Sequence, residues 1–243
     1  MEQKNLQAMI KEAERIVFFG GAGVSTGSGI PDFRGSGGLY TDTSETEESP
    51  EEMLSGDYLR KHPEKFYRYY RKNMLYSDAK PNGAHKALAK LEQSGKLTAV
   101  ITQNIDGLHQ AAGSRNVIEL HGSVLRNYCI SCYKEYPLSY IMQANGVPVC
   151  EHCGKPVRPD VVLYGEGLDG LAFARAQREI ECADLLIVGG TSLTVYPAAG
   201  LIHHFTGKHF VIINQTPTPY DAYATLIIRE PIENVLASAM ENL

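Results

Sequence analysis

The sequence predicts an α/β fold: a doubly wound, parallel, Rossmann-like sheet with a smaller zinc-binding and helical domain. Three observations favour this class. Apolar runs alternate with stretches of helical period, the order that builds a parallel sheet covered on both faces. The runs end in glycines or small polar residues, as at the ligand crevice of such a sheet. Four cysteines in two Cys-x2-Cys pairs interrupt this alternation.

Length and composition set the first limits. The chain has 243 residues, is 43% hydrophobic and 21% charged, and carries a formal net charge of −5. This length admits one large core and a small appended module. The acidic balance argues against direct binding of nucleic acid, and no apolar run approaches the roughly 18 residues of a membrane span. The polar residues 1–5 lack the apolar region of a signal peptide, so we expect a cytoplasmic protein without membrane contact. We also expect a monomer.

The N-terminal segment contains a helix, a strand and a glycine-rich loop. Four apolar residues recur at helical spacing: Leu6, Met9, Ile10 and Ala13. Residues 15–19 then form a buried strand that runs into glycines and small hydroxyls at 20–29. Such a loop lets backbone N–H groups approach a phosphate, and we expect phosphate binding here. The match to G-x-G-x-x-G is incomplete, because Thr26 stands where the third glycine belongs.

The segment after this loop is less regular. Residues 30–35 (IPDFRG) place an aromatic ring and an arginine where they would either cover a ligand or brace the loop. Residues 36–50 are rich in Ser, Thr, Gly and Glu, which is typical of a mobile loop. A helical stretch follows at about 57–76. We expect its aromatic residues to form helix-packing surface rather than a base-stacking platform.

The middle of the chain carries the most concentrated chemistry. A helix near 81–95 precedes an apolar strand at 97–101. Amide, carboxylate and imidazole side chains follow at once in residues 102–109 (TQNIDGLH). A short strand at 117–120 then leads to a further imidazole, His121. Polar groups just past two strand ends predict a ligand site.

Five cysteines are present. Seventeen residues separate two Cys-x2-Cys pairs, a spacing typical of a four-cysteine zinc site: Cys129, Cys132, Cys150 and Cys153. The alternative, two disulfides, requires an oxidising compartment that the sequence does not indicate. The region 126–156 is too small to fold without its metal. We expect Cys182 to be a small buried hydrophobe.

The C-terminal half completes the alternation. An extended segment, a helix, three strands and a last helix are predicted at 158–166, 171–181, 184–188, 209–213, 224–228 and 232–240. Small or polar residues follow five strands of the chain: Gly20 and Gly21, Gln103 and Asn104, His121, Thr191 and Ser192, and Asn214. Five such ends place a nucleotide across the carboxyl edge of the sheet.

These motifs resemble those of sirtuins of the bacterial type, the NAD-consuming protein-lysine deacylases. The four cysteines match the structural zinc module of that family. The other matching blocks follow in the family's order at 21–25 (GAGVS), 29–35 (GIPDFRG), 102–109, 119–122 (ELHG), 161–166 (VVLYGE), 190–193 (GTSL) and 213–214. The resemblance covers the chain from about residue 16 to its end.

The resemblance implies NAD-dependent deacetylation of protein lysines, with nicotinamide, O-acetyl-ADP-ribose and free lysine as products. His121 would deprotonate a ribose hydroxyl that then receives the acyl group. An imidazole, which titrates near neutrality, is a suitable base for that step. The alternative, a core histidine, is disfavoured by its place at a strand end. Because Glu119 and His121 are two residues apart on an extended strand, their shared face is expected to point into the cleft.

The same matching implies further roles. Asn104 and Asp106 would join His121 as catalytic residues by lining the nicotinamide pocket, with Ile105 supplying backbone contacts and Gln103 holding the ribose. Phosphates and the reactive ribose would be held or covered by Gly21, Ala22, Gly23, Thr26, Asp32, Phe33 and Arg34. Phosphates and adenosine would contact Thr191, Ser192, Asn214 and Ile232. The peptide would add as a strand along Val161, Val162, Tyr164 and Gly165. Phe33, Val161 and Tyr164 would line an apolar tunnel for a neutral acyl-lysine.

One departure bears on the acyl group. Family members that prefer succinyl or malonyl groups carry Tyr-x-x-Arg on the helix before the Pro-Asn turn. Here Tyr67 is followed by Tyr70 at the arginine position, and Arg68 and Arg71 lie on other helix faces. Without the bidentate guanidinium, we expect acetyl and other neutral acyl groups.

Three alternative functions remain open at this point, and the sequence also predicts how the chain divides into domains. The chain could be a mono-ADP-ribosyltransferase, a deacylase that prefers longer neutral acyl groups, or a zinc-knuckle module that binds nucleic acid. The acidic balance and the strand ends disfavour the last. We expect a discontinuous NAD-binding domain (1–35, 81–122 and 159–243) and a small domain made of a helical module (36–80) and a zinc-ribbon module (123–158).

Overall fold

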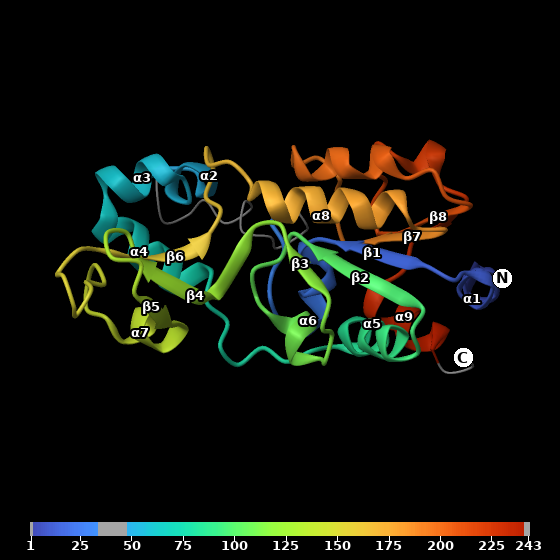
Figure 1. Cartoon of the computed structure of the whole chain (residues 1–243), viewed down its shortest axis with the longest axis horizontal. Helices are drawn as coiled ribbons and strands as arrows, with labels where there is room; N and C mark the ends of the chain where they lie inside the picture. Colours follow the sequence, from blue (N-terminus) through green and yellow to red (C-terminus); the bar gives the residue numbers. More distant parts are fainter. Residues whose placement is uncertain (1, 34–47, 241–243) are drawn as a thin grey trace.

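The computed structural model describes residues 2–33 and 48–240. Within these ranges, six strands form a sheet in the order β3-β2-β1-β7-β8-β9 (Figure 1). All neighbours in this sheet are parallel. Its strands are β1 (Ile16–Gly20), β2 (Leu97–Thr102), β3 (Val117–Glu119), β7 (Leu185–Gly189), β8 (His209–Ile213) and β9 (Leu226–Ile228). The chain reverses its direction of travel across the sheet between β1 and β7, so the predicted doubly wound fold is confirmed.

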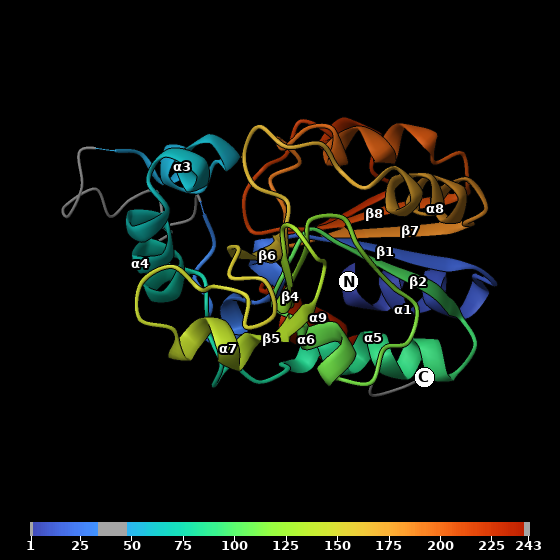
Figure 2. The ribbon, with the colours of Figure 1, turned by 60° about the vertical axis from the view of Figure 1, so that its left-hand side comes forward.

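Helices cover both faces of this sheet (Figure 2). The helices α1 (Glu2–Glu12), α5 (Gly83–Gln93) and α9 (Ile232–Ala239) pack on one face, and α8 (Gly170–Glu181) and the 3-10 helix η3 (Ala198–His204) on the other. In β1, Ile16 and Phe18 enter the first core while Val17 and Phe19 enter the second. A parallel strand buried on both faces requires such a continuous apolar run. None of the described helices is both long and apolar enough to cross a membrane.

A second group of elements forms a smaller lobe, on the left in Figure 1. Its antiparallel sheet has the order β5-β4-β6, from β5 (Glu135–Pro137), β4 (Gly122–Cys129) and β6 (Val157–Val161). The lobe's helices are α2 (Pro50–Met53), α3 (Gly56–Lys61), α4 (Pro63–Asn73) and α7 (Leu138–Gln143). Both groups of elements share one core, and the buried Tyr67 hydroxyl on α4 donates to the Val157 carbonyl at 2.5 Å. The helical and cysteine-containing segments therefore pack as one body.

Some sequence expectations change. The helix expected near 57–76 is two helices, because Pro63 begins α4 and the preceding His62 leaves the helical conformation (φ −134, ψ 54). Phe66, Tyr67 and Tyr70 are buried in the shared core, so the expected packing role of this aromatic segment is confirmed. Within the expected loop 36–50, residues 36–47 lie outside the described ranges, and Pro50 begins α2.

Two further expectations are wrong. Cys182 is exposed rather than buried, because it caps the C-terminus of α8 where the chain turns toward β7. The extended segment expected at 158–166 remains a strand only as far as Val161. Other boundaries differ by one or two residues, the usual uncertainty at element ends.

Candidate active site

A cleft of 1080 Å³ lies across the carboxyl ends of β1, β2, β7 and β8 and extends to the smaller lobe. Every described residue that the sequence nominated for NAD, catalysis or peptide lines it: Gly21, Ala22, Gly23, Thr26, Asp32, Phe33, Gln103, Asn104, Ile105, Asp106, His121, Val161, Val162, Tyr164, Gly165, Thr191, Ser192, Asn214 and Ile232. Arg34 lies outside the described residues. The structure therefore places these predicted residues in one cleft.

The glycine-rich loop packs directly on the end of β7. The Gly23 N–H donates to the Gly190 carbonyl at 2.8 Å. A Cβ at Gly23 would lie 2.8 Å from the Gly190 Cα, and one at Gly21 would lie 2.8 Å from the Thr191 Cβ. There is thus no room for side chains at Gly21 and Gly23, where the loop crosses between β1 and β7, the point at which the strand order reverses. Thr26, which replaces the expected third glycine, donates its hydroxyl to the Gly23 carbonyl at 3.0 Å and so closes the turn.

A hydrogen-bonded group joins this loop to the segment after β2. The Asn104 carboxamide donates to the Ser25 hydroxyl at 3.0 Å, and that hydroxyl donates to the Asp106 carboxylate at 2.6 Å. The second Asp106 oxygen accepts the Leu108 N–H at 2.9 Å. Ser25 is only 1% exposed, and no separate role was predicted for it. The sequence signal for Ser25 was its small hydroxyl side chain next to the glycines of the loop. The sequence alone does not distinguish such a serine from an ordinary turn residue.

His121 lies just past β3, with Nδ1 2.9 Å from the carbonyl oxygen of Gln103. A carbonyl can only accept, so in the neutral ring Nδ1 carries the proton and Nε2 is left to take one. Burial lowers the pKa of His121 below its ordinary value, and the Gln103 carbonyl opposes that shift. The imidazole is therefore neutral near pH 7, the state that a general base requires. The His121 carbonyl accepts the Val162 N–H at 3.0 Å, which joins His121 to the cleft wall predicted for the peptide.

Glu119 does not line the cleft, contrary to expectation. Its carboxylate accepts from Gln110 Nε2 at 2.8 Å and from Arg126 Nη1 at 2.7 Å. The reason is local, because β3 ends at Glu119 and the chain turns through Leu120. The two-residue alternation of an extended strand therefore does not reach His121.

The wall predicted for the peptide is held on two sides. The Tyr164 N–H donates to the Leu54 carbonyl at 3.0 Å, and its own carbonyl accepts the Gly56 N–H at 3.1 Å. On the second side, the Arg158 guanidinium makes a bidentate hydrogen-bonded contact with the Glu166 carboxylate, at 2.7 and 2.9 Å. The same carboxylate accepts the Leu163 N–H at 3.0 Å, so residues 161–166 form a braced turn.

The position that would decide acyl charge carries an uncharged side chain. Tyr70 lines the cleft, is fully buried and stacks on Phe66 with ring centroids 5.5 Å apart. Burial raises the pKa of Tyr70, so its hydroxyl is neutral. Arg71 donates to the Ile141 carbonyl at 2.8 Å, and Arg68 is exposed. The Arg71 guanidinium is therefore engaged by a backbone carbonyl, and Arg68 lies at the surface.

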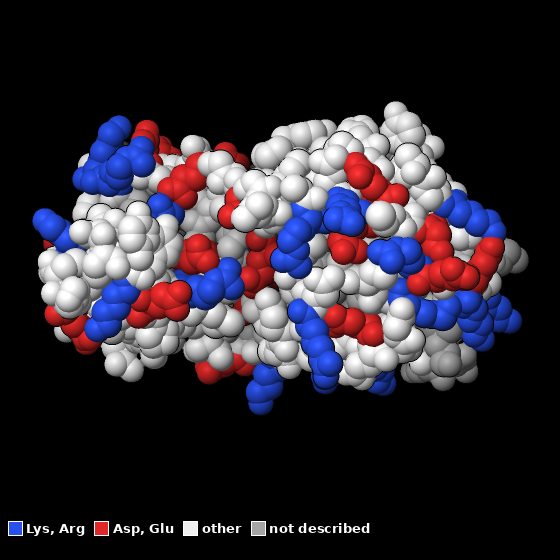
Figure 3. Space-filling model, viewed as in Figure 1, with Lys and Arg blue, Asp and Glu red and all other residues white. Residues whose placement is uncertain are grey.

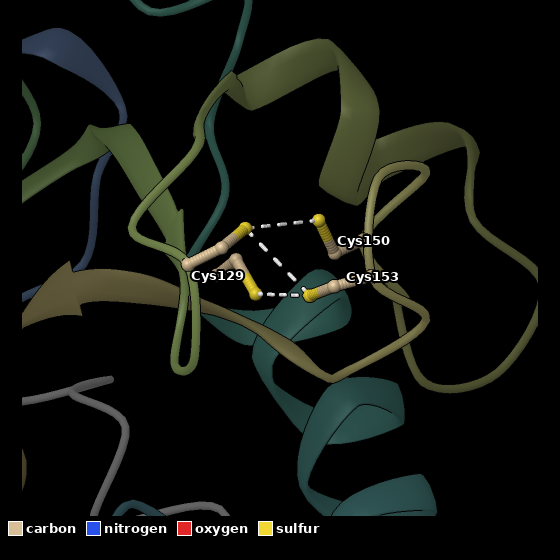
Figure 4. Close-up of side chains that lie close together, drawn as sticks. Cys129, Cys150 and Cys153 are labelled. Carbon is tan, nitrogen blue, oxygen red and sulfur yellow. Dashed lines mark hydrogen bonds between the residues drawn. The ribbon is translucent and has the colours of Figure 1, made fainter.

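The four paired cysteines form one cluster in the smaller lobe (Figure 4). All four Sγ atoms lie within 4.8 Å of one another. The Cys129–Cys153, Cys132–Cys150 and Cys132–Cys153 Sγ separations are 3.4, 3.5 and 3.6 Å, too long for disulfides. Tetrahedral zinc with Zn–S near 2.3 Å would set these edges at about 3.8 Å. The residues fit a four-thiolate zinc ion, and the Tyr136 hydroxyl lies 3.1 Å from the Cys150 Sγ.

The chain is similar to known proteins along almost its whole length. Residues 21–197 match the model of the Sir2 family. An NAD-dependent protein deacetylase of Clostridium tetani is 54% identical over 242 residues, which cover 99% of this chain and 98% of that protein. The enzyme of the same name from Cutibacterium acnes is 52% identical over 98% of this chain and 97% of its own.

Solved structures give the same result. A Sir2 protein in complex with a deacetylated p53 peptide and 3'-O-acetyl ADP ribose is 41% identical, with a TM-score of 0.91 and coverage of 100% of this chain and 98% of that one. A Sir2 protein with a p53 peptide and NAD+ is also 41% identical, with a TM-score of 0.88 and the same coverage. The sequence predictions of the family and of an NAD-dependent deacetylase are confirmed by these relatives. The matched region contains the glycine loop, the His121 segment and the cysteine cluster, and the chain belongs to the Sir2 family.

Proposed function

We propose that the chain deacetylates lysine side chains of proteins with NAD as co-substrate and His121 as the general base. The observation that carries this is the His121 imidazole, whose Nδ1 is fixed to the Gln103 carbonyl inside the cleft that the glycine loop also lines. NAD, when bound, supplies the anomeric carbon that the acetyl oxygen attacks as nicotinamide leaves. His121 Nε2 takes the proton of a ribose hydroxyl, which then receives the acetyl group. One water molecule adds to the acetyl carbon as the lysine nitrogen leaves it, so NAD, acetyl-lysine and water give free lysine, nicotinamide and O-acetyl-ADP-ribose.

The residues around the Asp106 carboxylate would orient the nicotinamide. Ser25 and Leu108 N–H fix both carboxylate oxygens, and Asn104 is fixed through the same hydroxyl. A carboxamide ligand needs both donors and acceptors, and this group offers them without further reorganisation. Gln103 donates to the Thr191 hydroxyl at 3.2 Å, which joins the proposed ribose and phosphate contacts across the β1–β7 switch point.

We propose neutral acyl-lysine as the substrate class, with acetyl-lysine proteins as the main partners. Two Sir2 structures contain p53 peptides, and a third Sir2 structure, 40% identical to this chain, contains a propionylated peptide. The buried Tyr70 and the apolar Val161 and Leu163 on the cleft wall suit an uncharged chain, because a charged one would lose its hydration without a partner.

The remaining attributes are proposals of the same kind. We propose a cytoplasmic monomer whose four-cysteine cluster holds one structural zinc. On the face in Figure 3, Lys and Arg are interspersed with Asp and Glu, which supports action without direct nucleic-acid contact. The proposed NAD-binding domain comprises 1–35, 81–122 and 159–243, with 36–80 and 123–158 in the small domain. The pairing of β6 with β4 favours moving residues 159–161 to the small domain.

The test is a product analysis with NAD and an acetyl-lysine peptide. Equal amounts of deacetylated peptide, nicotinamide and O-acetyl-ADP-ribose are expected. His121→Ala should lose this turnover and still bind NAD by calorimetry. A peptide or protein made heavier by one ADP-ribose would favour mono-ADP-ribosyl transfer, and NAD that stays intact would sink both readings. Comparing acetyl, butyryl and succinyl peptides settles the acyl preference.

A further inference from the structure

The N-terminus of α5 is joined to the glycine-rich loop by one side chain outside the lining of the cleft. Asn82 caps α5, and its Oδ1 accepts the Ala84 N–H at 2.9 Å. Its Nδ2 donates to the Val24 carbonyl at 2.8 Å and to the Ser28 hydroxyl at 3.0 Å. Val24 ends the 3-10 turn η1 (Ala22–Val24), and Ser28 ends the next, η2 (Thr26–Ser28). The two ends of one carboxamide therefore serve two different elements.

The orientation of this carboxamide is itself fixed. The fully buried His85 accepts the Asn82 N–H through Nδ1 at 3.3 Å, which completes a capping box. Burial lowers the pKa of His85 to about 4, so Nδ1 stays an acceptor at neutral pH. On the other side, Glu233 of α9 packs closely: a Cβ at Gly83 would lie 2.6 Å from its carbonyl, and one at Gly27 would lie 2.8 Å from its carboxylate. The loop, α5 and α9 meet here in close contact.

The tether acts on the peptide bond that carries Ser25. The Val24 carbonyl accepts from Asn82, while the N–H of the same peptide unit, on Ser25, donates to the Ala22 carbonyl at 3.0 Å. Both polar groups of that unit are thereby held, and the direction of the Ser25 side chain is set. Ser25 is the residue that joins Asn104 to Asp106.

We propose that Asn82 is a positioning residue for NAD: its two Nδ2 contacts hold the loop in the shape that aligns Ser25 with the nicotinamide pocket. This rests on the role given to Ser25 in the proposed function. A plain helix cap is the competing account, and the chemistry separates the two. Capping uses Oδ1, whereas the tether uses Nδ2.

Asn82→Ser is the decisive variant, because a serine hydroxyl still caps a helix but has no second group to reach Val24. We expect a thermal midpoint above that of Asn82→Ala because the cap is kept, an unchanged peptide KM, and a KM for NAD raised about tenfold, the effect of roughly 1.4 kcal/mol. Asn82→Asp should behave alike, because its carboxylate caps well but repels the Val24 carbonyl. Asn82→Ala should show the same NAD defect together with a lower midpoint.

Asp169→Ala is the matched control. Asp169 caps a different helix, α8, by accepting the Ala172 N–H at 2.7 Å. Its loss should lower the midpoint and leave the KM for NAD as in the wild type. The proposal is overturned if Asn82→Ser leaves the KM for NAD unchanged, or if Asp169→Ala raises it equally.

A binding readout keeps this test separate from the test of function. Calorimetric titration of wild type and Asn82→Ser with ADP-ribose and with NAD needs no turnover. We expect the NAD affinity to fall by about the same tenfold as the KM rises. Equal affinities in the two proteins would refute the tether even if deacetylation is found. If the wild type shows no deacetylation but still binds NAD more tightly than Asn82→Ser does, only the proposed reaction is refuted.

Discussion

At the scale of single residues, His121 is governed by two opposing effects. Burial lowers its pKa, and the hydrogen bond to the Gln103 carbonyl raises it, with burial the larger. The base form therefore survives to a lower pH than for an exposed histidine, whose pKa is about 6.5. We expect the acid limb of kcat/KM for deacetylation to have its midpoint below that value.

A pH profile between 5 and 8 with a constant-ionic-strength buffer measures this limb. Binding of NAD by calorimetry at each pH serves as the control, since it should not follow the same curve. A midpoint at or above the ordinary histidine value would contradict the assignment of His121 as a buried base.

The sequence located the site residues well where they follow regular strands. Apolar runs fixed the strand ends, and parallel strands bring their carboxyl ends to one edge. Predictions from the sequence were wrong at residues where a regular strand or helix ends. Glu119 faces Arg126 rather than the cleft because β3 ends there, and Cys182 is exposed because α8 ends there. Ser25 was missed because its two partners come from a segment about eighty residues away.

At the scale of elements, α5 and α6 (Leu108–Ala111) bring two buried imidazoles together. The rings of His85 and His109 have centroids 4.7 Å apart, and neither His109 nitrogen has a hydrogen-bond partner among the described residues. Burial lowers the pKa of His85 to about 4 and that of His109 to about 3. Both are neutral in the folded protein at pH values where the unfolded chain is protonated.

The sign of the pH effect follows. Below about pH 6.5 the unfolded chain binds protons that the folded chain does not, so stability falls as pH falls toward 4. Each such histidine contributes a slope approaching about 1.4 kcal/mol per pH unit. We expect His109→Leu to show a shallower loss of unfolding free energy between pH 6 and pH 5 than the wild type.

Urea unfolding at several pH values measures these slopes, whatever the absolute stability of each variant. His62→Leu is the control, because it removes a histidine from an exposed position. Equal slopes for wild type and His109→Leu would show that His109 does not titrate as a buried neutral group.

The turn after β6 gives a second prediction at this scale. Arg158 and Glu166 have side chains only 19% and 25% exposed, and the carboxylate also holds the Leu163 N–H. Glu166→Gln keeps the shape but weakens these charged hydrogen bonds, by about 1–2 kcal/mol after allowance for solvent. The cleft wall at 161–165 should loosen, so that the peptide KM rises while the KM for NAD stays constant.

Steady-state kinetics with each substrate varied in turn measures the split. Asp57→Asn is the control, since the Asp57–Arg60 pair is 66% and 70% exposed and such pairs contribute little. An unchanged peptide KM in Glu166→Gln, or an equal rise for NAD, would contradict the bracing role of this pair.

At the scale of the whole molecule, the described chain packs into two cores around the parallel sheet and a third core in the smaller lobe. The first two were predictable, because continuous apolar strands between amphipathic helices imply burial on both faces. The third was not. Its members come from segments near 53–70 and 124–163, and no local pattern reveals that Tyr67 packs against a strand ninety residues away.

The four-cysteine cluster that is proposed to hold zinc lies in this third core. Cys129 and Cys150 are buried among the core residues, beside Tyr136 and Val157. The same core contains Val161 and Leu163 of the peptide wall.

Because a small lobe of this kind owes its folding to its metal, Cys150→Ser or a strong chelator should release one zinc per chain and abolish peptide binding. Amide protection should be lost over β4 and β6 and retained in β1 and β7, which lie in the other cores. Metal analysis with hydrogen exchange measures both effects, and Cys182→Ser, outside the cluster, should keep its zinc. A soluble, metal-free and fully active Cys150→Ser protein would show that the lobe folds without zinc, and that the peptide wall depends only on the Arg158–Glu166 and Tyr164 contacts that brace it directly.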